Sequence, residues 1–142
     1  MRAILSALLL TLFFMNSTPS IAQKKLANYP KNIIYFGNGG GFAGMEFTYA
    51  LLENGDLYKK KSVEDKFSFI TRLSADATKQ IFSNYEFLGI PAMQLNEPGN
   101  TYFFIEFSNP SEKHKLVWSG QAAPDNLKLF YSILVHYIKA NN

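Results

Sequence analysis

The stretch that decides the fold reads Gly37-Asn38-Gly39-Gly40-Gly41-Phe42-Ala43-Gly44-Met45-Glu46-Phe47-Thr48-Tyr49-Ala50-Leu51-Leu52. It contains the spacing G-x-G-x-x-G, which is typical of dinucleotide-binding turns when a helix follows. The residues after Gly44 instead alternate between apolar and polar, with Phe47, Tyr49 and Leu51 on one side, and a period of two predicts a strand. We therefore interpret the glycines as a tight, positive-φ connection between two strands.

The segments on either side of this stretch extend the predicted sheet. Residues 33–36 form a short apolar run that predicts the strand before the glycines. Asn54-Gly55 separates residues 45–52 from residues 57–61, and Asn-Gly between two such runs is a strong hairpin signal. Residues 67–70 predict a further strand.

The second half of the chain predicts two helices and a second hairpin. Ser74 suits the N-cap of a helix with an apolar stripe, and Gly89 suits its end. Residues 101–107 predict an aromatic-rich strand, residues 114–118 its partner, and Pro124 the start of a closing helix. These elements predict an α+β fold: a single antiparallel sheet with two helices packed on one face.

The N-terminal residues have the three-part layout of a secretory signal peptide. A positive start and an apolar run from Ala3 to Met15 precede the small-residue site Ser20-Ile21-Ala22. We predict a signal peptide over residues 1–22, a polar tether over residues 23–31 and one domain over residues 32–142. The mature protein is then periplasmic or secreted. An uncleaved N-terminal membrane anchor is the alternative.

The composition predicts a globular chain without cross-links. Cysteine is absent, so neither disulfides nor a lipid-anchored cysteine can form. Aromatic residues make up 15% and charged residues 18% of the chain, which argues against disorder. The net charge of +3 falls by one when Arg2 leaves with the signal peptide. This small imbalance points neither to nucleic acid nor to a membrane surface as a partner. No later apolar run is long enough for a transmembrane helix, so we expect no membrane insertion after signal removal.

The sequence contains no recognised catalytic or metal-binding motif. The two histidines, His114 and His136, fit a strand end and a helix boundary better than a catalytic role. No H-E-x-x-H or G-x-S-x-G occurs, so we expect no enzyme, no metal site and no cofactor. The basic run of residues 59–61 is interpreted as protection of an exposed strand edge.

Gly40-Gly41-Phe42-Ala43-Gly44, directly after a first strand, resembles the opening of the emfourin family. Members of that family are small proteinaceous inhibitors of protealysin, a thermolysin-like zinc metalloprotease. The similarity extends through the order of elements over about residues 33–138. The signal peptide and the lysine-rich strand after Asn54-Gly55 depart from the family pattern. The resemblance implies an inhibitor whose target is a thermolysin-like metalloprotease.

Three functions remain open from the sequence. The first is inhibition through a loop whose surface or scaffold is Gly40, Gly41, Phe42, Ala43 and Gly44. Phe42 either projects from this loop or folds back onto the core. The second is a cell-envelope or periplasmic module that holds a small ligand between sheet and helices. The third is a small hydrolase with a dispersed triad, which requires a histidine beside a serine and an acid.

Overall fold

The structure, a computed structural model, describes residues 21–120 and 122–141. The strands are β1 (Ile33–Gly40), β2 (Phe47–Leu52), β3 (Asp56–Lys61), β4 (Ser68–Arg72), β5 (Asn96–Glu97), β6 (Thr101–Ser108) and β7 (Lys113–Trp118). The helices are α1 (Ile21–Ala27), α2 (Ala75–Phe87), α3 (Asp125–Lys139) and the short 3₁₀ helix η1 (Ile90–Ala92). The predicted signal peptide, residues 1–22, lies almost wholly outside the described residues.

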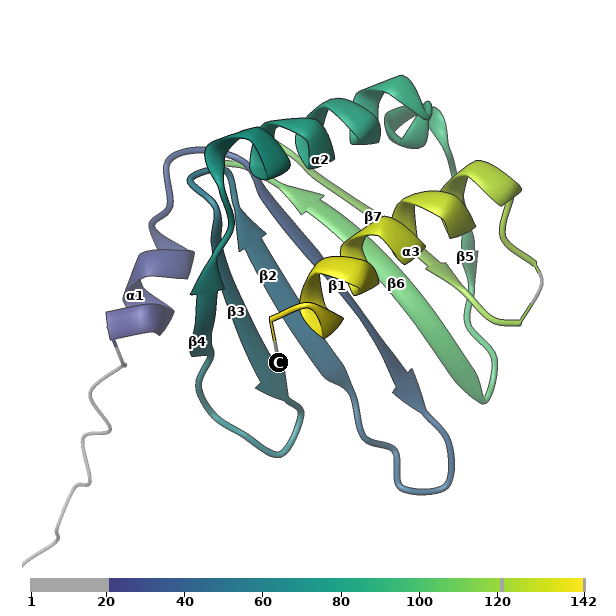
Figure 1. Cartoon of the computed structure of the whole chain (residues 1–142). Coiled ribbons are helices and arrows are strands. Elements are labelled where there is room, and N and C mark those ends of the chain that lie inside the picture. The colour runs from purple at the N-terminus through teal and green to yellow at the C-terminus, as the bar shows by residue number, and fades with distance from the viewer. Residues whose placement is uncertain (1–20, 121, 142) are drawn as a thin grey trace, which may run out of the picture.

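The strands form one sheet in the order β4-β3-β2-β1-β6-β7-β5 (Figure 1). The predicted α+β class is confirmed, but a purely antiparallel sheet is wrong, because β5 pairs with β7 in parallel through Asn96 opposite Val117. The chain leaving η1 runs back along this edge for only two residues. A strand that short has no periodicity from which it can be predicted.

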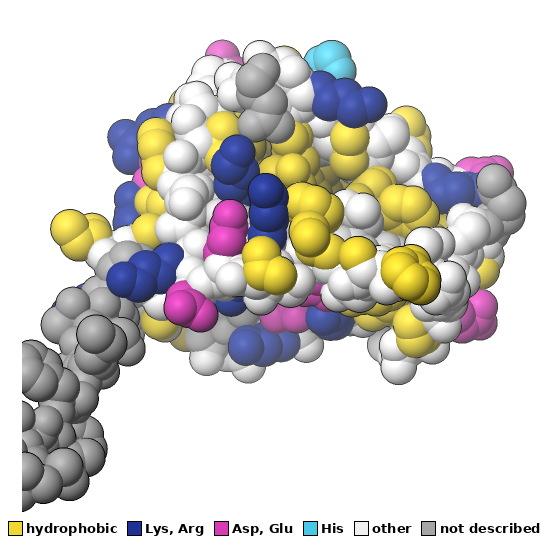
Figure 2. All heavy atoms as spheres, turned by 90° about the horizontal axis from the view of Figure 1, so that it is seen from below, with side chains coloured by type: hydrophobic (Ala, Val, Ile, Leu, Met, Phe, Trp, Pro, Cys, Tyr) yellow, Lys and Arg dark blue, Asp and Glu magenta, His cyan; other side chains and the backbone are white. Residues whose placement is uncertain are grey.

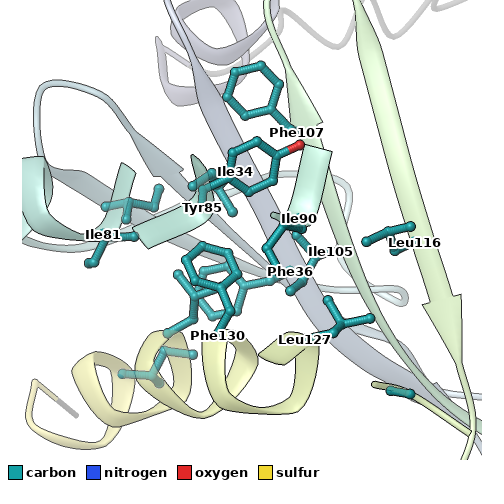
Figure 3. Packing of buried hydrophobic residues seen from close by; sticks show 14 of the residues in the cluster. Ile34, Phe36, Ile81, Tyr85, Ile90, Ile105, Phe107, Leu116, Leu127 and Phe130 are labelled. Carbon is teal, nitrogen blue, oxygen red and sulfur yellow. The ribbon is translucent and has the colours of Figure 1, made fainter. Parts of the chain in front are cut away.

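The two predicted helices, α2 and α3, cross the same face of the sheet (Figure 1). Ser74 caps α2 as expected, since its hydroxyl accepts a hydrogen bond from the N–H of Ala77 at 3.2 Å. The main core fills the space between helices and sheet. Tyr85 of α2 stacks on Phe107 with ring centroids 4.9 Å apart, and Phe130 of α3 reaches toward Phe36 (Figure 3).

The opposite face of the sheet carries a second, smaller core beneath α1. Leu26 of α1 is only 5% exposed and belongs to a cluster with four residues of the sheet. These four are Ile33, Ala50, Leu52 and Tyr58. Residues 23–31, predicted as a polar tether, thus include most of a packed helix. Its single buried leucine leaves no apolar stripe in the sequence that could reveal it.

A buried carboxylate links α1 to the sheet. Asp56 of β3 is 1% exposed and forms ion pairs with Lys25 of α1 and, at 2.5 Å, with Nε of Arg72 in β4. The side chain of Asn54 also donates to it, at 3.2 Å. Burial alone raises the pKa of Asp56, but these three donors outweigh burial and lower that pKa to about 2.

The predicted hairpin at Asn54-Gly55 is confirmed, because β2 pairs antiparallel with β3 across this turn. The N–H of Gly55 donates to the carbonyl of Leu52 at 2.8 Å, and Gly55 has φ of 93°. Asn54 keeps a negative φ, as do all other non-glycine residues that the structure describes. Only the glycine therefore needs the left-handed conformation here.

None of the helices in the described part of the chain combines the length and the apolar character needed to cross a membrane.

Candidate functional site

The glycine-rich segment ends β1 and then forms a tight turn. The N–H of Gly44 donates to the carbonyl of Gly41 at 3.1 Å, and Phe42 and Ala43 occupy the two central positions. Gly40, Gly41 and Gly44 have φ of 89°, 77° and 58°, values that favour glycine. The chain then enters β2, so no helix follows the glycines and the argument against a dinucleotide turn is confirmed.

Phe42 projects from this turn into solvent. The residue has a relative exposure of 112%, so its ring does not fold back onto the core. The hydrogen bond between Gly41 and Gly44 closes the turn and so sets the position of Phe42. An aromatic ring held in this way is free to contact another molecule.

Neighbouring loops fix the turn from both sides. The N–H of Gly41 donates to the carbonyl of Asn100 at 2.7 Å. On the other side, Glu46 and Ser62 bond reciprocally: the N–H of Ser62 donates to the carbonyl of Glu46 at 2.8 Å, and Ser62 Oγ accepts from the N–H of Glu46 at 3.1 Å. The turn is therefore anchored at its base on both sides.

Two glycines of β1 make room for aromatic rings on the face opposite α2 and α3. Gly37 lies opposite Phe104 and Gly39 opposite Tyr102 in the β1–β6 register. A Cβ atom at Gly39 would lie 2.6 Å from the Tyr102 hydroxyl oxygen. That hydroxyl donates to Glu46 at 2.6 Å, and this bond raises the pKa of Tyr102. The ring thus bridges β1 and ties β6 to the start of β2.

On the helix-covered face, a second tyrosine holds the same strand. Tyr131 of α3 donates to the carbonyl of Gly37 at 3.1 Å. Its ring meets Phe103 and Trp118 edge-on, with centroids 5.4 Å from each. Burial raises the pKa of Tyr131 to about 12, so this phenol remains a donor at neutral pH. β1 is therefore fixed on both faces just before the turn.

We call the end of the sheet formed by residues 41–46, 62–67 and 98–100 the loop end; it is the lower edge in Figure 1. Figure 2 looks directly at it and shows hydrophobic side chains gathered in the middle, with basic and acidic side chains beside them. Two hollows open nearby. One, of about 310 Å³, includes Phe47 and Tyr49, and another, of about 350 Å³, includes Phe103 and Trp118.

The candidate catalytic groups are engaged elsewhere or isolated. His114 contacts the carbonyl of Met93 at 2.8 Å and the hydroxyl of Tyr85 at 3.1 Å, and neither partner is a serine or an acid. His136 is exposed on α3 and its ring lies edge-on to Tyr137. Across the described residues, no group of three or more histidine, aspartate or glutamate side chains could hold a metal ion.

The sequence predicted that lysines 59–61 protect an exposed strand edge. This is not true of all three. β3 lies between β2 and β4, and Lys59 pairs with Ser68. Only Lys60 and Lys61 extend beyond the end of β4. Edge protection therefore does not explain Lys59.

Several residues that support the turn were not predicted from the sequence, namely Glu46, Ser62, Asn100, Tyr102 and Tyr131. One signal was available for Tyr102: the alternating glycines at 37 and 39 match the alternating aromatics at 102 and 104. Recognising that match requires the register between β1 and β6, which pattern alone does not supply. Comparison of the sequence with protein-family models, and with curated proteins, gives no match.

Proposed function

We propose that this protein is an exported binding protein that inhibits a thermolysin-like zinc metalloprotease through the loop of residues 40–44. The observation that carries the proposal is the fully exposed ring of Phe42 on a turn anchored by hydrogen bonds to Asn100 and Ser62 through its flanking residues. The resemblance of Gly40-Gly41-Phe42-Ala43-Gly44 to the emfourin opening names the class of target.

Rigidity of the loop supports inhibition more than a passive structural role. A loop that is ordered before binding loses little conformational entropy in the complex, which favours affinity. The hydrogen bonds from Gly41 to Asn100, from Gly44 to Gly41 and between Glu46 and Ser62 restrict the conformations available to the turn. Inhibition of this kind needs neither a catalytic residue nor a cofactor in this chain.

The test is a titration of thermolysin and related zinc metalloproteases with the purified exported protein, using a fluorogenic peptide substrate. We expect stoichiometric or micromolar inhibition of at least one enzyme. A serine protease serves as the control and retains full activity. Full activity of every metalloprotease at micromolar excess of the protein would rule the proposal out.

A small-ligand module is the alternative, and one observation favours it. An open hollow of about 550 Å³ lies between α2 and the end of the sheet opposite the loop end, and Asn32, Phe82 and Phe107 contribute to its lining. This hollow lies between a helix and the sheet, where the alternative places its ligand. Thermal-shift screening with small molecules, repeated on Phe82→Ala, tests the alternative independently of any protease.

A further inference from the structure

Strand β3 places two lysines on the helix-covered face next to the loop end. Side chains alternate along a strand, and Leu57 points into the main core, so Lys59 and Lys61 lie on the same face as Leu57. Both are exposed. Lys61 lies one residue before Ser62, which bonds to the base of the turn that carries Phe42.

These lysines border the hollow of about 310 Å³ together with two aromatic residues of β2. Phe47 pairs with Lys61 and Tyr49 with Lys59 across the two strands. The Nζ atom of Lys61 lies 6.0 Å from the centre of the Phe47 ring. The hollow therefore has an aromatic side on β2 and a positively charged side on β3.

The two ammonium groups have no acidic partner within the part of the chain that the structure describes. Among the described residues that line the hollow, Glu64 is the acid, and its carboxylate accepts from the backbone N–H of Lys61 at 2.9 Å. Because Lys59 pairs with Ser68 of β4, protection of an exposed strand edge does not explain the charge of Lys59. Two exposed ammonium groups without an ion pair, beside the half-buried rings of Phe47 and Tyr49, are well placed to receive carboxylates from outside.

We propose that this hollow binds an extended acidic segment of the partner protein, with glutamates at alternate positions facing Lys59 and Lys61. The inference rests on the proposed function in treating the loop end as the contact surface for that partner. Side chains two residues apart on a strand are about 7 Å apart, and an extended peptide repeats the same spacing. The methylene groups of each glutamate then lie against Phe47 and Tyr49, while the carboxylates approach the ammonium groups.

The charge also has a kinetic consequence. Positive potential at the rim of an interface accelerates association with an acidic surface and makes the rate depend on salt. Lys59 and Lys61 would therefore guide the partner toward the turn, and Phe42 would contact it afterwards. The two sites differ in character, one electrostatic and one apolar.

The experiment uses peptides and needs no protease. The exported protein, labelled with ¹⁵N, is titrated at low ionic strength with acetyl-Ser-Glu-Ser-Glu-Ser-amide, at concentrations on the order of millimolar because a short peptide binds weakly. We expect amide shifts on β2 and β3 around Phe47 and Lys61. The glutamine peptide acetyl-Ser-Gln-Ser-Gln-Ser-amide is the matched control and produces no such shifts.

Two double variants test the residues. Lys59→Gln with Lys61→Gln removes the proposed contacts, and we expect at least tenfold weaker binding of the glutamate peptide. Lys24→Gln with Lys79→Gln removes the same total charge from exposed sites elsewhere and retains the binding. Circular dichroism verifies that both fold.

Three results would overturn the inference: no shifts, equal shifts with the glutamine peptide, or equal loss in the two double variants. None of them bears on inhibition, which the protease titration decides separately. Conversely, the acidic peptide could bind in this hollow while no metalloprotease is inhibited. That result would support the binding site and rule out the proposed target.

Discussion

Phe42 contributes nothing to the core, because its ring is fully exposed. Burying a phenylalanine side chain in a partner contributes about 2 kcal/mol, which corresponds to roughly thirtyfold in affinity. We therefore expect Phe42→Ala to weaken inhibition by about that factor while the midpoint of thermal unfolding stays unchanged. Inhibition titrations and calorimetry measure the two quantities.

Phe87 is the matched control for Phe42, since it is 86% exposed at the end of α2. Phe87→Ala removes the same surface from a different place and should leave inhibition intact. Equal loss in both variants would show that the effect is general, and unchanged inhibition in Phe42→Ala would remove Phe42 from the contact surface.

Gly37 is required by space and not by backbone conformation. A Cβ atom there would lie 1.8 Å from the carbonyl oxygen of Phe47 and 3.1 Å from the ring of Phe104. The oxygen belongs to a paired backbone and cannot move without separating β1 from β2. We expect Gly37→Ala to lower the free energy of unfolding by about 3 kcal/mol, measured by urea denaturation.

Gly44 provides the contrast within the same segment. It has φ of 58° but no atom lies within 4 Å of its Cβ position, so Gly44→Ala pays only for the left-handed backbone, about 1 kcal/mol. If Gly37→Ala and Gly44→Ala lower the free energy of unfolding equally, close packing does not explain the glycine at position 37.

At the scale of elements, Asp56 connects α1, β3 and β4, and its pKa sets a pH dependence. The folded-state pKa of about 2 lies below the usual 3.8, so the stability that the carboxylate contributes is present above pH 4 and is lost as the pH falls toward 2. The difference between the two pKa values corresponds to about 2 kcal/mol. We expect Asp56→Asn to lower the free energy of unfolding by about this amount at pH 7.

The sign of that effect gives a clear test. Between pH 4 and pH 2 the native protein should lose stability toward that of Asp56→Asn, and the gap between their unfolding curves should close. Replacement of an exposed acid, Asp76→Asn, controls for the general loss of carboxylate charge. A gap that stays constant down to pH 2 would contradict the low pKa.

Elements with a repeating pattern could be predicted, and the rest could not. The alternation from Phe47 to Leu51 and the stripes of α2 and α3 located their elements within a few residues. β1 was predicted only to residue 36, because Gly37 to Gly40 carry no side-chain pattern although they pair fully with β6. β5 and α1 were not predicted because neither has a repeating pattern: β5 has two residues, and α1 buries only Leu26.

The candidate site was predicted in the same partial way. Residues 40–44 were identified as a turn because glycine favours positive φ, and Phe42 was recognised as an apolar tip that either projects or folds inward. Its full exposure and its anchoring by Asn100 depend on loops distant in sequence. The pairing of lysines with aromatic residues across β2 and β3 depends on the register of the two strands. That register follows from the length of the turn at Gly55, which the sequence alone does not give.

For the whole molecule, the sheet separates a large core beneath α2 and α3 from a small one beneath α1. The unequal sizes imply unequal local stability, because fewer buried contacts hold α1 than hold the central strands. The turn with Phe42 joins β1 and β2, and β1 lies between β2 and β6 at the centre of the sheet. Opening of α1 should therefore leave the turn with Phe42 in place.

Hydrogen exchange under native conditions tests this division. We expect amides of α1 to exchange through a local opening with a free energy well below that of global unfolding, whereas amides of β1 and β6 exchange only on global unfolding. Leu26→Ala should lower the opening free energy of α1 by about 2 kcal/mol, since it removes the helix's buried side chain. Lys24→Ala, on the exposed side of the same helix, is the control and should have little effect. A single free energy shared by α1 and β6 would instead mean that the small core unfolds only with the large one, and that the two faces of the sheet act as one cooperative unit.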